Sequence, residues 1–85
     1  MKIKCTEGKS VGGRRSAGNM VRVFVDNDFR YGYWVVEDQL LALLDVEVQA
    51  AYLRADADFT VDVEPHVAQK IVDMGMTPYN KVKVA

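Results

Sequence analysis

The chain has one cysteine and one histidine, and it has no long apolar run. The single cysteine, Cys5, cannot form an internal disulfide, so we expect packing to hold the fold and the protein to reside in the reducing cytosol. No apolar stretch approaches the roughly 18 residues of a membrane span, and the N-terminal residues lack the apolar segment of a signal peptide. The formal net charge is −1, which excludes a uniformly basic nucleic-acid binder and a strongly acidic disordered tail.

Catalytic and cofactor motifs are missing as well. His66 follows a proline at an expected helix start and Cys5 lies on an expected strand, and neither has a visible partner for acid–base or nucleophilic chemistry. Gly8 and Gly13 have the spacing of a phosphate-binding loop, but Arg14 and Arg15 follow in place of Lys and Ser or Thr. We therefore expect no enzymatic activity and no cofactor.

The 85 residues, 49% of them apolar, form one expected domain over residues 1–85. Alternating apolar residues predict strands at about 2–6, 20–26, 29–36 and 56–64. Helical spacing and end signals predict a helix at about 38–54, broken or bent near Asp45, and a helix at 65–74. Residues 82–84 could add an edge strand. The expected fold is α+β, with a small antiparallel sheet of about four strands and two helices packed on one face.

The two strands at 20–26 and 29–36 are expected to form a hairpin whose turn is centred on Asn27-Asp28. This register pairs Arg22 with Tyr33 and Val21 with Trp34, whereas a three-residue turn would shift the pairing by one and exchange the faces. In the first register Arg22 shares its face with aromatic residues: Phe24, Phe29, Tyr31 and Tyr33. Such a face is typical of a core, a protein interface or a nucleic-acid site.

Charge is distributed unevenly along the chain. Residues 1–22 carry an excess of five positive charges, and residues 37–73 carry an excess of seven negative charges. The segment 7–19 is rich in glycine and basic residues, so we expect a mobile loop with almost nothing to bury. Its Arg14 and Arg15 could bind phosphates or an acidic protein surface, or the loop could be ordinary solvated surface.

The expected strand at 56–64 places acidic residues on one face: Asp56, Asp58, Asp62 and Glu64. Side chains along a straight strand diverge instead of converging on one ion, so we expect no metal site here. The row could instead mimic the phosphates of a nucleic acid and occupy a basic groove, or it could be a solvated strand face.

The sequence thus predicts a non-enzymatic interaction module that docks on a protein partner with a basic, nucleic-acid-associated surface. The expected contact residues are Asp56, Asp58, Asp62, Glu64 and Glu47, with a secondary basic and aromatic contact formed by Arg14, Arg15, Arg22, Phe24, Tyr31 and Tyr33. In size and charge, though by no motif, the chain is similar to virus-encoded inhibitors of nucleic-acid machinery such as anti-CRISPR proteins. The alternatives are a small nucleic-acid-binding domain and a structural subunit of an oligomer.

Overall fold

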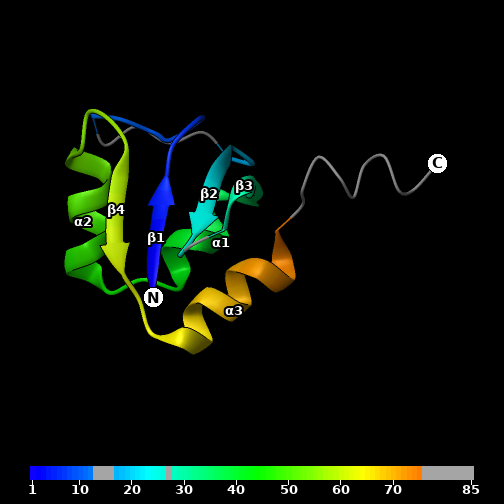
Figure 1. Ribbon diagram of the computed structural model, residues 1–85. Coiled ribbons are helices and arrows are strands. Elements are labelled where there is room, and N and C mark those ends of the chain that lie inside the picture. The colour runs from blue at the N-terminus through cyan, green and yellow to red at the C-terminus, as the bar shows by residue number, and fades with distance from the viewer. Residues whose placement is uncertain (13–16, 27, 76–85) are drawn as a thin grey trace.

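A computed structural model describes residues 1–12, 17–26 and 28–75, with the side chains of residues 28–31 left out. The elements are β1 (Lys2–Cys5), β2 (Met20–Val25), β3 (Asp28–Val36), α1 (Glu37–Ala42), α2 (Val46–Arg54), β4 (Phe59–Asp62) and α3 (Pro65–Met74). The strands form a four-stranded antiparallel sheet in the order β3-β2-β1-β4 (Figure 1). The predicted α+β class and four-stranded sheet are therefore confirmed, and the edge strand expected at 82–84 lies outside the described residues.

The helical segment before β4 is divided into two helices, so three helices are described where two were expected. Asp45 is the N-cap of α2, at the position where the sequence indicated a break. The side-chain amide of Gln49 donates hydrogen bonds to the carbonyl oxygens of Leu41 and Leu44, at 2.7 and 2.8 Å. The carbonyls at the end of a helix lack the amide partners of its interior. Gln49 supplies a donor to both, and the Leu41 carbonyl also accepts a 3.0 Å hydrogen bond from the Leu44 amide.

Strand β4 is shorter than the predicted strand at 56–64. It pairs with β1 from Lys2–Asp62 to Cys5–Phe59, and β1 itself has four residues. Backbone hydrogen bonds between Met1 and Val63 continue this pairing by one position. Asp56 and Asp58 precede the strand, and Glu64 follows it as the N-cap of α3. Helix α3 begins at Pro65 and ends before Gly75, as predicted.

One hydrophobic cluster joins the sheet and the helices. The alternating residues of β1 and β2 are buried, and each of the three helices adds side chains to the same cluster. Its buried members are Ile3, Cys5, Val21, Val23, Val25, Val35, Leu40, Leu41, Leu44, Tyr52, Ala68 and Ile71. Burial of such side chains contributes about 1.5–3 kcal/mol each for the larger aliphatic ones. None of the described helices is long and apolar enough to cross a membrane.

The predicted register of the β2–β3 hairpin is wrong by one residue along the strands and by two at the hairpin end, where Asp28 belongs to β3 and not to the turn. Arg22 pairs with Trp34 and Val23 with Tyr33, while Val25 pairs with Asp28 at the hairpin end. The register shifts between Val23 and Val25 because β3 has nine residues and β2 has six, so a bulge accommodates the surplus. Gly32, with φ of +64°, lies within this bulged segment. The predicted turn residue Asn27 lies outside the described residues.

The shifted register exchanges the faces of the β3 aromatic residues. Because directly paired residues of an antiparallel sheet point to the same side, Tyr33 joins Val23 and packs against the hydrophobic core. Trp34 instead joins Arg22 on the opposite face, where it is half-buried. The expected grouping of Tyr33 with Arg22 is therefore wrong, and the alternative register is the one that buries Val21 and Val35 as a pair.

Candidate functional site

The five acidic residues predicted to contact a partner are all exposed, and we call them the acidic surface: Glu47, Asp56, Asp58, Asp62 and Glu64. They come from α2, the α2–β4 connection, β4 and the start of α3. Asp58 forms an ion pair with Lys4 at 3.7 Å, and Glu64 lies 3.2 Å from Nδ1 of His66. Within the described part of the chain, the side chains of Glu47, Asp56 and Asp62 have no hydrogen-bond or ionic partner.

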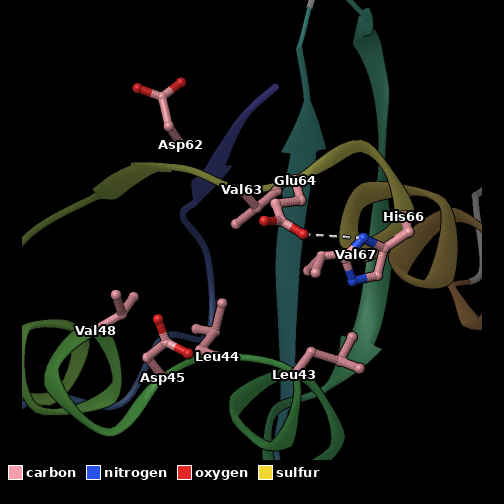
Figure 2. Close-up of a pocket in the computed structure, with 9 residues that line it drawn as sticks. All are labelled: Leu43, Leu44, Asp45, Val48, Asp62, Val63, Glu64, His66 and Val67. Carbon is pink, nitrogen blue, oxygen red and sulfur yellow. Dashed lines mark ion pairs between the residues drawn. The ribbon is translucent and has the colours of Figure 1, made fainter.

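A cavity of about 290 Å³ lies between the α1–α2 junction and the β4–α3 junction (Figure 2). Its apolar lining consists of Leu43, Leu44, Val48, Val63 and Val67, and its polar lining consists of Asp45, Asp62, Glu64 and His66. Figure 2 shows the carboxylate of Asp62 pointing away from the other lining side chains, whereas Glu64 faces His66. The cavity therefore has an apolar wall with two carboxylates, those of Asp45 and Glu64, beside it.

Both of these carboxylates stand at helix N-termini. Asp45 is the N-cap of α2 and Glu64 is the N-cap of α3, and neither side chain forms a capping hydrogen bond. Each helix N-terminus carries about half a positive elementary charge. The half-charges offset only part of the charge of the two carboxylates, and Glu64 also faces the His66 ring. The sequence indicated Asp45 as a break in the helix and gave no sign that it lines a cavity.

A second polar cluster is buried beneath the segment that precedes β2. Glu37 is 1% exposed. Its carboxylate accepts hydrogen bonds from the backbone N–H of Ser10 (2.9 Å), the Ser10 hydroxyl (2.5 Å), the side-chain amide of Asn19 (3.2 Å) and the Tyr52 hydroxyl (2.6 Å). Burial alone would raise the pKa of Glu37, but these hydrogen bonds outweigh it and hold the pKa below its ordinary value. The cluster ties residues of the loop to α1 and α2.

This cluster corrects the expectation that the loop at 7–19 has almost nothing to bury. Lys9 and Ser10 are half-buried. The Lys9 ammonium donates to the carbonyl oxygens of Ser10 and Ala55, at 2.8 and 2.7 Å, and lies 4.7 Å from the centre of the Tyr52 ring. The described part of the loop is thus fastened to α2, because an amphipathic lysine stem can be buried when its head finds carbonyl partners.

The described members of the predicted secondary contact do not all lie on one face of the structure. Arg14, Arg15 and the side chain of Tyr31 lie outside the described residues, and Tyr33 packs against the core. Arg22 and Phe24 do come together, with the guanidinium 5.0 Å from the ring centre, and Arg22 also lies 3.3 Å from Glu7. The exposed face of the hairpin therefore keeps Arg22 and Phe24 from the predicted set and adds Trp34.

Neither a metal centre nor a reactive thiol is found in the described residues. No group of three His, Cys, Asp or Glu side chains there could hold a metal ion. Cys5 is fully buried, and its desolvation raises the pKa of the thiol to about 12, which keeps it in the unreactive protonated form. Comparison of the chain with protein-family models, with curated proteins and with solved structures finds no match.

Proposed function

We propose that the protein is a non-enzymatic interaction module that binds a basic surface of a protein partner through its acidic surface. The observation that carries this proposal is the set of exposed carboxylates on Glu47, Asp56 and Asp62, which have no partner within the described residues. Carboxylates without an ion-pair partner are available to an approaching cation, and surface charge of one sign accelerates encounter with a surface of the opposite sign.

An exposed apolar residue supports the same location. Val46, between Asp45 and Glu47 at the start of α2, is 80% exposed. Protein interfaces combine an apolar centre with a polar rim, and α2 supplies both kinds of side chain in adjacent positions. An exposed apolar residue with an acidic residue on each side in the sequence favours a protein partner over a purely electrostatic one such as a polycation.

The partner that we propose is a nucleic-acid-handling protein of the cytosol. Its basic groove would accept carboxylates where it otherwise accepts phosphates, and occupation of that groove would inhibit it. The cytosolic setting is supported by the single, buried and protonated thiol of Cys5, which is suited to a reducing compartment.

A second candidate function is supported by the exposed face of the hairpin. Arg22 and Trp34 are directly paired there, and Phe24 lies under the Arg22 guanidinium. Aromatic and cationic side chains on a sheet surface can stack bases and contact phosphates. Two cations of the sheet, Lys4 and Arg22, are already engaged by Asp58 and Glu7, which weakens attraction to phosphate and leaves this function second.

The proposal is tested by affinity capture from the native host lysate with the tagged protein and two variants. The variant Asp56→Lys/Asp62→Lys reverses two acids of the acidic surface, and Asp73→Lys reverses an exposed acid near the end of α3 as a control. We expect the native protein and the control to retain the same basic protein and the double variant to lose it. If all three recover the same material and nuclease treatment removes it, the proposal is wrong and the hairpin face becomes the site.

A further inference from the structure

We propose that the cavity beside the acidic surface receives one long cationic side chain, lysine or arginine, from the partner (Figure 2). The inference rests on the proposed function and adds an anchoring contact to it. The acidic surface would attract the partner over a wide area, whereas the cavity would fix the position of a single residue. Anchors of this kind, in which one side chain fills a pocket, concentrate binding energy in protein interfaces.

The apolar wall of the cavity suits the methylene stem of such a side chain. Leu43 and Leu44 lie at the end of α1, Val48 lies in the first turns of α2, and Val63 and Val67 flank the start of α3. Lysine and arginine carry three or more methylene groups before the charged head, and these stems pack along apolar surface while the head remains polar. The wall would thus bury the stem without demanding hydrogen bonds from it.

The carboxylates of Asp45 and Glu64 suit the charged head. Asp45 has no side-chain hydrogen bond or ion pair within the described residues, and Glu64 is engaged by the exposed His66. An anionic side chain would meet two like charges here. A purely apolar side chain would pack against the apolar wall, but it would desolvate the Asp45 carboxylate without giving it a partner, which is unfavourable. A side chain that is apolar along its length and cationic at its end complements both the apolar wall and the carboxylates.

The occupant can be tested without knowledge of the partner. The full chain, labelled with nitrogen-15, would be titrated with the N-acetyl amides of arginine and lysine while amide shifts are recorded. The N-acetyl amides of citrulline and norleucine serve as probes of similar length without a charge. We expect saturable shifts at the cavity residues with the cationic probes and binding roughly tenfold weaker with the neutral ones.

A pair of matched variants locates the contact. Asp45→Asn removes the charge beside the cavity and retains a good N-cap residue for α2, so the fold is preserved. Asp56→Asn removes the same charge from the acidic surface outside the cavity. We expect the first variant to weaken binding of the arginine probe severalfold and the second to leave it within about twofold.

Two results would overturn the inference: equal binding of citrulline and arginine, or shifts spread over the exposed acids without saturation at the cavity. Failure of the inference is distinguishable from failure of the proposed function. If the captured partner is lost by Asp56→Lys/Asp62→Lys but retained at full affinity by Asp45→Asn, the acidic surface binds the partner and the cavity does not. If the double variant keeps the partner, the proposed function itself is wrong.

Discussion

The hydroxyl of Tyr52 donates a 2.6 Å hydrogen bond to the buried carboxylate of Glu37, and this contact joins α2 to the first residue of α1. The same carboxylate holds Ser10 and Asn19 from the segment between β1 and β2. A charged group in this position is stable because it accepts four hydrogen bonds. Glu37 therefore fastens three parts of the chain that are far apart in sequence.

Replacement of Glu37 by glutamine should destabilise the fold. The amide group would present hydrogen atoms where Ser10, Asn19 or Tyr52 now donates, so at least one buried donor would lose its acceptor. We expect the free energy of unfolding to fall by about 2–3 kcal/mol, measured by urea denaturation followed by circular dichroism. Glu47→Gln, which makes the same change at an exposed position, should stay within about 0.5 kcal/mol of the native protein.

The Glu37 carboxylate should also make stability depend on pH. Its pKa in the folded protein is lowered from the ordinary value of 4.5, so its contribution is fully present above that value. The contribution is then lost as the pH falls through the lower folded pKa, because protonation removes the charge and places an O–H donor on an oxygen that now only accepts.

Urea midpoints measured from neutral pH down to acid test this dependence. The native protein should lose stability steadily below the ordinary glutamate pKa. In Glu37→Gln this part of the slope should be absent, while any slope from other carboxylates remains. An unchanged slope in the variant would show that Glu37 does not account for the acid sensitivity.

The thiol of Cys5 should be protected from thiol reagents in the folded protein. The side chain is fully buried and its pKa is raised to about 12, whereas an exposed thiol has a pKa of about 8.5. With Ellman's reagent near neutral pH we expect slow reaction of the native protein and rapid, stoichiometric reaction in denaturing guanidinium chloride. Equal rates under the two conditions would mean that β1 opens freely.

Gly8→Ala should be more destabilising than the same change at Gly18. Both glycines have positive φ, +84° and +77°, where an L-residue costs about 1–2 kcal/mol. At Gly8 the added Cβ would also lie 2.3 Å from the carbonyl oxygen of Met20, whereas at Gly18 it would meet no atom within 4 Å. Thermal unfolding of the two variants should therefore place Gly8→Ala clearly below Gly18→Ala. Equal melting temperatures would contradict the close approach of Gly8 to β2.

Local signals in the sequence predicted most of the elements. The alternating valines of β2 indicated a half-buried strand, Pro65 and Gly75 marked the two ends of α3, and Asp45 marked the break between α1 and α2. Each of these signals depends on backbone geometry within a few residues. They could therefore be read without knowledge of what packs against them.

The register of the hairpin and the length of β4 were decided by tertiary contacts. The surplus residues of β3 enter a bulge, which turned Tyr33 toward the core and Trp34 away from it. Four-residue pairing with β1 limited β4, although the alternating pattern continues on both sides. Register depends on which faces are buried together, and that is a property of two strands and not of one.

The sequence by itself determined the fold class, the position of most elements and the concentration of negative charge between residues 37 and 73. Only the tertiary structure decided that Glu37 is a buried acceptor, and that Asp45 and Glu64 stand beside one cavity. The reason is physical: an acidic side chain has the same charge in any segment, and its role depends on the donors, the apolar walls and the water that folding places around it.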